Sequence, residues 1–140
     1  MSDGLGGVDT HKVPEMTIEF FEERNVGTRT LPRSLATKAG GFVFVSGQVA
    51  RDENGDVIAG AIEGHTRQTM KNVAHALALA GCTLEDVVKT TVWLDDARDF
   101  DEFNRAYSEF FPGNKPARST MQSTNMVGTK IEIEVVAYKP

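Results

Sequence analysis

The chain has 140 residues, of which 40% are hydrophobic and 25% are charged. This length and balance are typical of one globular domain with its own hydrophobic core. The net charge of −5 argues against broad nucleic-acid binding, which needs a basic surface, and no apolar run approaches the roughly 18 residues of a membrane span.

Residues 1–16, MSDGLGGVDTHKVPEM, are rich in glycine and polar residues. This composition predicts a flexible N-terminal arm, which leaves residues 17–140 as a single domain.

With no signal peptide and one cysteine, Cys82, the chain is expected in the reducing cytoplasm and without an internal disulfide. Cys82 is predicted to be a packing residue and not a nucleophile. The histidines have no metal-ligand spacing, so no metal site is expected from His11, His65 and His75.

The first predicted element is a short edge strand over Thr17–Glu23. An apolar run between glycines then predicts a buried strand near residues 42–51. The Asn54-Gly55 pair that follows is typical of a type I′ hairpin turn, because both central residues of that turn need a positive φ. A partner strand is therefore expected near residues 56–59.

The pattern becomes helical from about Glu63 to Ala80, and Gly81 is expected to end this helix in the left-handed conformation. A run of β-branched residues, Asp86–Leu94, predicts the next strand. The apolar face of the helix is predicted to carry Met70, Val73, Ala74, Leu77 and either Ala80 or Gly81.

A second helix is expected after Asp99, a predicted N-cap with Glu102 as its capping-box partner. The pair Pro112-Gly113 stops that helix. Its inner face is predicted to be aromatic, with Phe100, Phe103, Tyr107, Phe110 and Phe111.

Two strands near residues 117–123 and 130–138 complete the predicted fold. Two amphipathic helices among five or more strands indicate an α+β domain of two layers, with both helices on one face of the sheet. The other face is predicted to be half apolar and so to favour self-association. Its candidate residues are Val43 or Phe44, Thr90, Val92 and Val136.

The stretch KPARSTMQ places Arg118 just after a proline, at the start of a predicted strand. A guanidinium offers a planar fork for a carboxylate, and Thr120, two residues on, shares its face in a strand. This pattern fits a carboxylate clamp with a hydroxyl beside it. A surface ion pair explains the same residues, and composition alone favours that simpler alternative.

Glu132 lies in KIEIEVVAYKP, where acidic and apolar residues alternate. A solvated strand face is the simplest interpretation, and the alternative is a carboxylate that positions or activates water near an anion held by Arg118. If the last two strands form a simple hairpin, Thr120 opposes Glu132. Gly47, which follows Ser46, either marks a bulge or lets a backbone amide approach a ligand.

Five segments, in this order and spacing, resemble the RidA/YjgF family, whose older label is endoribonuclease L-PSP: AGGFVFVSGQ, AGCTLEDVVKTTVWLDD, FNRAYSEFF, KPARST and KIEIEVVAY. The resemblance covers roughly Leu31 to Tyr138. It implies a chorismate-mutase-like α+β fold with a mixed sheet, assembled as a homotrimer with ligand clefts between subunits. It also implies hydrolysis of reactive enamine or imine intermediates of amino acids, such as 2-aminoacrylate, to a 2-keto acid and ammonia. No metal or organic cofactor is implied.

Residue by residue, the resemblance assigns substrate carboxylate binding to Arg118 and water positioning to Glu132. It assigns backbone contacts at the pocket to Gly47, after Ser46, and places Asn104, in FNRAY, near the cleft.

Two positions depart from the family pattern. Arg33 stands where the family often has a pocket tyrosine, and Thr120 stands where it often has a cysteine. Hydrolysis needs no thiol, so Thr120 is expected to preserve it. Arg33 is expected either to recruit a dicarboxylate or to fold outward and widen the mouth of the cleft. The alternatives are therefore a related deaminase with a different carboxylate substrate and a trimeric binding protein without turnover. Nuclease action on RNA is least favoured, because the sequence has no basic stripe or aromatic stacking platform.

Overall fold

The computed structural model of the protein describes residues 17–22 and 31–140. The arm predicted over residues 1–16, which includes His11, lies outside the described residues. The strand predicted over Thr17–Glu23 is present in a shorter form, as the first strand of the sheet.

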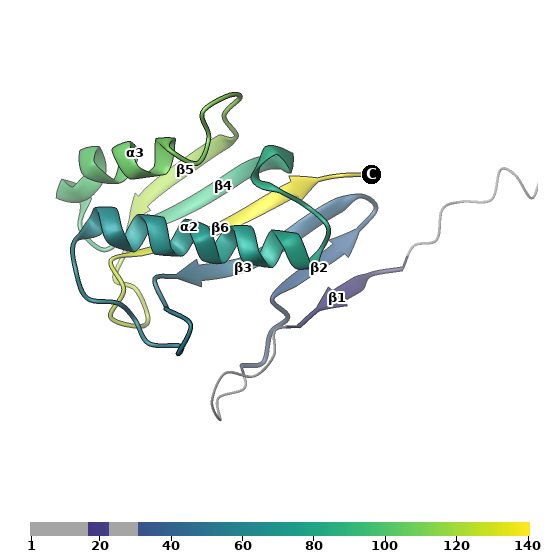
Figure 1. The fold of residues 1–140 in the computed structure, drawn as a ribbon, viewed down its shortest axis with the longest axis horizontal. Coiled ribbons are helices and arrows are strands. Elements are labelled where there is room, and N and C mark those ends of the chain that lie inside the picture. The colour runs from purple at the N-terminus through teal and green to yellow at the C-terminus, as the bar shows by residue number, and fades with distance from the viewer. Residues whose placement is uncertain (1–16, 23–30) are drawn as a thin grey trace, which may run out of the picture.

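Six strands of the described residues form one mixed sheet with the order β1-β2-β3-β6-β4-β5 (Figure 1). Neighbouring strands are antiparallel except β4 and β5, which run parallel. The last strand of the sequence therefore lies inside the sheet, between β3 and β4. The strands are β1 (Glu19–Phe21), β2 (Ala36–Ala39), β3 (Phe42–Val49), β4 (Val87–Leu94), β5 (Ala117–Gln122) and β6 (Ile131–Tyr138).

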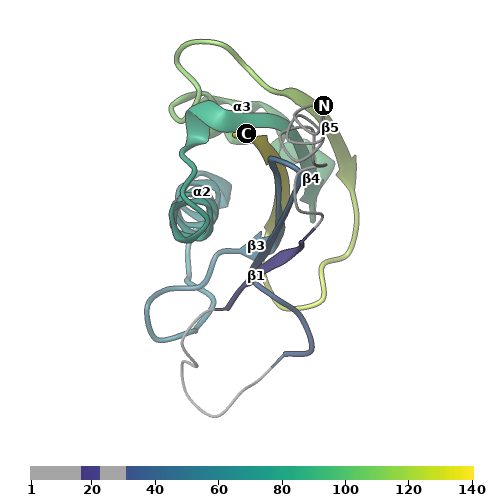
Figure 2. The same ribbon diagram turned by 90° about the vertical axis from the view of Figure 1, so that its right-hand side faces the viewer.

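Both α-helices of the described residues cover the same face of this sheet (Figure 2). α2 (Ile62–Leu79) packs on β3 and β6, and α3 (Phe100–Ser108) packs beside α2. The predicted two-layer α+β architecture is confirmed. The core between the layers includes the fully buried side chains of Leu35, Met70, Leu77, Phe103, Ile131 and Ile133.

The end of α2 follows its predicted pattern closely. Gly81 has a φ of +80°, and the Cys82 N–H donates to Leu77 O at 2.8 Å, which closes the helix in a Schellman arrangement. Cys82 is 3% exposed and packs in the core, as predicted. Met70, Val73 and Leu77, which the helical period placed on the apolar face, are all fully buried on one side of α2.

The predicted hairpin after β3 is only partly present. Gly55 has a φ of +83°, but Asn54 is not in the left-handed region, so the predicted type I′ turn is wrong. The Asp52 carboxylate instead accepts hydrogen bonds from the N–H groups of Asn54 and Asp56, at 2.9 and 3.1 Å. A turn does form, because the Gly55 N–H donates to Asp52 O at 3.0 Å, and the Asp52 carboxylate supports it. Beyond this turn only a single bridge forms, between Arg51 and Val57, with no strand over residues 56–59.

The start of α3 also differs from the prediction. Asp99 precedes the helix but makes no side-chain capping bond, so the capping box with Glu102 is not formed. A short 3₁₀ turn, Ala97–Asp99, leads into the helix instead, and the Asp96 carboxylate accepts from the Arg98 N–H at 2.9 Å. The capping role has therefore moved to Asp96, at the start of that turn.

The last two strands do not form a hairpin, because β4 lies between them. Thr120 is paired with Val92 of β4, whereas Glu132 is paired with Trp93 of β4 and Val49 of β3. The opposition of Thr120 and Glu132, which was conditional on such a hairpin, therefore does not apply.

The face of the sheet without helices is partly apolar, as predicted. Phe44 is 46% exposed there, and Val136 is its paired neighbour on β6. Thr90 and Val92 are fully buried under the helices, so their predicted place on the open face is wrong, as is the Val43 alternative to Phe44.

Candidate active site

Arg118 lies on β5, at the edge of the sheet, and faces the helix layer. It is paired with Thr90, a buried residue whose hydroxyl lies 2.8 Å from the Tyr107 hydroxyl of α3. The guanidinium carbon of Arg118 lies 5.7, 5.1 and 5.0 Å from the ring centres of Phe100, Phe103 and Tyr107, respectively. Cation–π attraction therefore holds the side chain against α3 without using its N–H donors.

A pocket of about 450 Å³ opens beside this guanidinium, between α3 and the segment that enters β5. Lys115 braces that segment, because its Nζ donates to Phe111 O at 2.9 Å and to Gly113 O at 3.0 Å. A cation and an amide between aromatic walls suit a small carboxylate ligand. The pocket is lined by Asn104, Tyr107, Ser108, Phe111, Lys115, Pro116 and Arg118.

Glu132 lies on β6 and points to the open face of the sheet, because Ile131 and Ile133 on either side are buried under the helices. Its carboxylate lies over Gly47 of β3. A Cβ placed on Gly47 would be 3.0 Å from Glu132 Cδ and closer still to Oε2. The β3–β6 register shifts between Val45 and Gln48, so Gly47 lies in a bulge. The missing side chain of Gly47 makes the space that the carboxylate fills.

The electrostatic surroundings of Glu132 favour its protonated form. Burial raises the pKa of Glu132 above its ordinary value, and the neighbouring Glu134 carboxylate raises it further, whereas Arg33 lowers it. A carboxyl group with a raised pKa exchanges protons more readily near neutral pH, which is what general acid–base chemistry requires.

Ser46 joins the bulge to the segment that carries Arg33. Its hydroxyl donates to Ser34 O at 2.6 Å, and its N–H donates to Leu35 O at 2.9 Å. The Ser46 hydroxyl proton is therefore already used, and in this structure Ser46 anchors the segment next to Glu132.

The predicted site residues form two groups on opposite faces of the sheet. Arg118 faces the helices and Glu132 faces away from them, with β4 between their strands. Thr120 is on the face of Arg118 but does not line its pocket. We call Arg118, Asn104, Tyr107 and Lys115 the arginine half-site, and Glu132, Gly47, Ser46 and Arg33 the glutamate half-site.

Two residues of the arginine half-site and one neighbour of the glutamate half-site were not predicted as site residues from the sequence. Tyr107 was expected only as part of an aromatic helix face, and it also supports the guanidinium. Lys115 adjoins Pro116 in KPARST and lines the pocket. Its positive charge close to Arg118 in the sequence could have indicated a place in the same anion-binding site. Glu134 follows Glu132 by two residues, and alternation along the strand already places both on one face.

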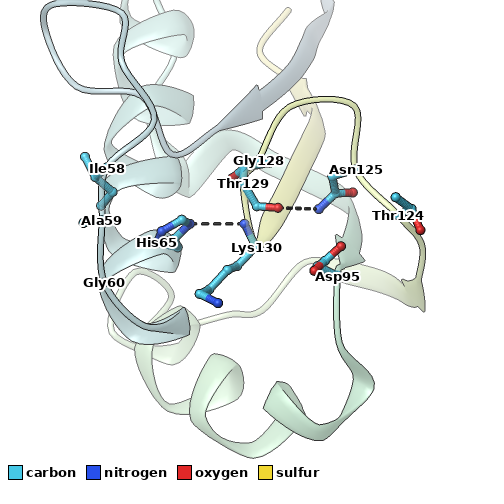
Figure 3. Close-up of a pocket in the computed structure, with 10 residues that line it drawn as sticks. All are labelled: Ile58, Ala59, Gly60, His65, Asp95, Thr124, Asn125, Gly128, Thr129 and Lys130. Atoms are coloured by element: carbon cyan, nitrogen blue, oxygen red, sulfur yellow. Dashed lines mark hydrogen bonds between the residues drawn. The ribbon is translucent and has the colours of Figure 1, made fainter.

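A second pocket, of about 440 Å³, lies between the start of α2, the end of β4 and the loop before β6 (Figure 3). His65, 2% exposed, accepts a hydrogen bond from the Lys130 N–H at Nδ1, at 3.2 Å. Burial lowers the pKa of His65, so it remains neutral and serves to hold this loop. Neither half-site contributes a residue to this pocket.

Within residues 17–22 and 31–140, no three His, Cys, Asp or Glu side chains gather as ligands for a metal ion. The same part of the chain contains no helix with the length and apolar character needed to cross a membrane.

Comparisons with known proteins place the chain in a family. The family described as "Endoribonuclease L-PSP" matches residues 30–139. A RutC family protein of Pyrococcus horikoshii is 42% identical over 110 residues, which cover 77% of this chain and 87% of that protein. The human 2-iminobutanoate/2-iminopropanoate deaminase is 38% identical over 110 residues, covering 77% of this chain and 80% of that enzyme. Other relatives are named as mitochondrial or chloroplastic proteins, so the cytoplasmic location stays a prediction.

Solved structures agree with the sequence relatives. The YjgF gene product of E. coli superposes with a TM-score of 0.79 at 30% identity, covering 87% of this chain and 99% of that one. TdcF of E. coli, solved with bound serine, gives a TM-score of 0.78 at 28% identity with the same coverage. From the match over nearly the whole described domain, the identity to these relatives and the shared fold, we conclude that the chain belongs to the RidA/YjgF family, which also carries the name endoribonuclease L-PSP.

Proposed function

We propose that this protein hydrolyses reactive enamine and imine intermediates of amino acids, of the 2-aminoacrylate and 2-iminopropanoate type, to a 2-keto acid and ammonia. The observation that carries the proposal is the presence, in one chain, of an arginine beside a pocket that suits a small carboxylate and of a half-buried glutamate with a raised pKa. The relatedness to the human enzyme named as a deaminase supports the reaction class.

The reaction divides between the two half-sites. Arg118 binds the substrate carboxylate through its guanidinium fork, which orients the neighbouring imine carbon. Starting from the protonated imine, Glu132 accepts a proton from water as the water oxygen bonds to that carbon and the C=N electron pair moves to nitrogen. The nitrogen of the resulting carbinolamine takes that proton from Glu132 and leaves as ammonia as the C–N bond breaks. The hydroxyl group meanwhile gives its own proton to Glu132, and its O–H electron pair forms the C=O bond of the keto acid. No step of this scheme uses a metal or an organic cofactor.

The two half-sites cannot meet within one chain, because Arg118 and Glu132 face opposite sides of the same sheet. A second copy must therefore bring its Glu132 to the Arg118 of the first. A homotrimer in the chorismate-mutase-like arrangement, with its partly apolar open faces turned inward and its clefts between subunits, satisfies this requirement. The exposed Phe44 on the open face supports such an association.

The test is release of ammonia and 2-keto acid from imines that an amino-acid oxidase generates in situ. Wild type is expected to accelerate release over the oxidase alone, and Arg118→Ala is expected to lose that acceleration. Absence of acceleration by wild type with all small 2-imino acids would contradict the proposal.

Two alternatives remain within the same site. A related deaminase acting on a different carboxylate substrate is favoured by Arg33 at a position where the family often has tyrosine. A binding protein without turnover is favoured by the serine bound in TdcF, since serine carries the same carboxylate group. Glu132→Gln separates binding from catalysis: ligand affinity is expected to persist in both cases, and turnover is lost only by an enzyme.

A further inference from the structure

The pocket beside Arg118 contains a second cation, Lys115. This lysine is exposed, and it lines the same pocket as the guanidinium group. Its Nζ donates to Phe111 O at 2.9 Å and to Gly113 O at 3.0 Å, which fixes the ammonium group beyond the end of α3. An ammonium group has three N–H donors, so these two bonds leave one donor for a ligand.

Neither cation of this pocket is neutralised by a carboxylate. The residues that line the pocket include no aspartate or glutamate. Within residues 17–22 and 31–140, neither Arg118 nor Lys115 forms an ion pair. Arg118 packs against aromatic rings, and Lys115 bonds to neutral carbonyl oxygens. The pocket therefore holds two uncompensated positive charges in a chain whose net charge is −5.

Two cations in one pocket favour a ligand with two anionic groups. The planar fork of Arg118 matches one carboxylate in two parallel bonds, whereas the ammonium of Lys115 is a compact charge that accepts an anion from several directions. The pocket volume of about 450 Å³ lies within the range of small-molecule sites, about 300–1,000 Å³. It has room for a short carbon chain between two carboxylates, and the rings of Tyr107 and Phe111 provide apolar walls for that chain.

We propose that Lys115 is a specificity-determining residue, which selects substrates that carry a second carboxylate at the end of the side chain, such as the imines of glutamate and aspartate. Arg118 binds the carboxylate next to the imine carbon, and Lys115 binds the distal carboxylate. The identification of the ligand as an imine rests on the proposed function. The preference of the pocket for dicarboxylates over monocarboxylates does not.

Binding of stable keto acids tests this preference without turnover. 2-Oxoglutarate and 2-oxopentanoate have carbon chains of equal length and differ in the distal carboxylate. Isothermal titration is expected to show that wild type binds 2-oxoglutarate about tenfold more tightly, as one charge-assisted hydrogen bond provides. Lys115→Gln, which removes the charge but keeps an N–H donor for the carbonyl oxygens, is expected to lose this preference and to keep its affinity for 2-oxopentanoate.

Two further variants complete the binding test. Lys115→Arg is expected to retain the preference, because it keeps the positive charge. Lys71→Gln, which removes an exposed positive charge of α2 outside the pocket, is the matched control and is expected to bind both keto acids as wild type does. In turnover, ammonia release from the imines of glutamate and norvaline, generated by amino-acid oxidases, is expected to show the same preference in wild type and its loss in Lys115→Gln.

The outcomes separate this inference from the proposed function. Equal affinity of wild type for the two keto acids would overturn the inference, whether or not the variants fold. A preference that survives in Lys115→Gln would also overturn it, and so would an equal loss of affinity for both ligands, because Lys115 would then only brace the segment before β5. If wild type hydrolyses no imine but has a preference for 2-oxoglutarate that depends on Lys115, the proposed function fails and the specificity of the pocket stands.

Discussion

Glu132 occupies the space that a side chain on Gly47 would need. A Cβ on Gly47 would lie 3.0 Å from Glu132 Cδ and nearer still to its Oε2. Gly47 is not in the left-handed region, so its backbone conformation is open to alanine and only the space is restricted. The position of the carboxylate and the identity of residue 47 are therefore directly coupled.

Gly47→Ala is expected to displace the Glu132 carboxylate and to lower kcat, while leaving the fold intact. The matched control is Gly64→Ala in α2, because a Cβ there meets nothing within 4 Å. That control is expected to keep activity and to stabilise the helix by about 0.5–1 kcal/mol. Imine hydrolysis and thermal denaturation measure the two effects, and full activity in Gly47→Ala would show that the carboxylate position is not critical.

The raised pKa of Glu132 makes a prediction about stability. The folded state binds this proton more tightly than the unfolded state does, so its contribution to stability is present at acid pH and is lost as pH rises through the raised pKa. Glu132→Gln is neutral at every pH. It is therefore expected to have a higher Tm than wild type at neutral pH, with the difference shrinking as pH falls through the raised pKa toward the ordinary glutamate pKa of 4.5.

Thermal denaturation of both proteins between pH 4 and pH 8 measures how the Tm difference changes with pH. This range begins near the ordinary glutamate pKa and extends above it. Glu53→Gln in the exposed loop after β3 controls for the removal of one negative charge. A wild type that gains stability over Glu132→Gln as pH rises would contradict the assignment of a raised pKa.

The sequence predicted the helices and most strands well because their signals are local. The α2 helix runs over Ile62–Leu79, one residue from its predicted bounds, since a long apolar period and a terminal glycine define it. β2 was missed because Ala36–Ala39 is short and carries no run of β-branched residues. The type I′ turn at Asn54-Gly55 was wrong because only Gly55 takes a positive φ, while the Asp52 carboxylate bonds the N–H groups of Asn54 and Asp56.

The site was predicted in its parts but not in its arrangement. Arg118, Glu132 and Gly47 stand in short motifs that are visible in the sequence, and each lies at a half-site. Their separation onto opposite faces depends on β4 inserting between β5 and β6, a pairing of distant segments. Because side chains alternate along a strand, such a change of neighbour alters which residues meet. Local sequence patterns contain no information on which distant strands become neighbours in the sheet.

Arg118→Lys tests whether the guanidinium fork matters beyond its charge. Lysine keeps the positive charge but cannot make two parallel bonds to one carboxylate. We expect kcat/KM to fall by about 10- to 100-fold in Arg118→Ala, from the loss of about 1.5–3 kcal/mol of charge-assisted bonding, and by less in Arg118→Lys. Arg98→Ala, whose side chain is 90% exposed, is the control. Equal activity of Arg118→Lys and wild type would indicate that charge alone suffices.

Mixing two impaired variants tests whether one cleft takes its residues from two copies. Arg118→Ala retains Glu132, and Glu132→Gln retains Arg118, so each alone is expected to have far less than a quarter of the wild-type activity. If every cleft joins the Arg118 of one copy to the Glu132 of its neighbour, random trimers from equal amounts regain intact pairs in about a quarter of their clefts. Activity is therefore expected to recover to about a quarter of the wild-type value after the two are unfolded and refolded together.

Mixing Arg118→Ala with the double variant Arg118→Ala/Glu132→Gln is the control, because no cleft then contains Arg118. Native mass spectrometry confirms that mixed assemblies have formed. Mixed trimers without recovered activity would exclude a cleft shared in this way. Since Arg118 and Glu132 face opposite sides of one sheet, a single chain would then have no means to bring them together, and the division of labour between clamp and proton acceptor would fail with it.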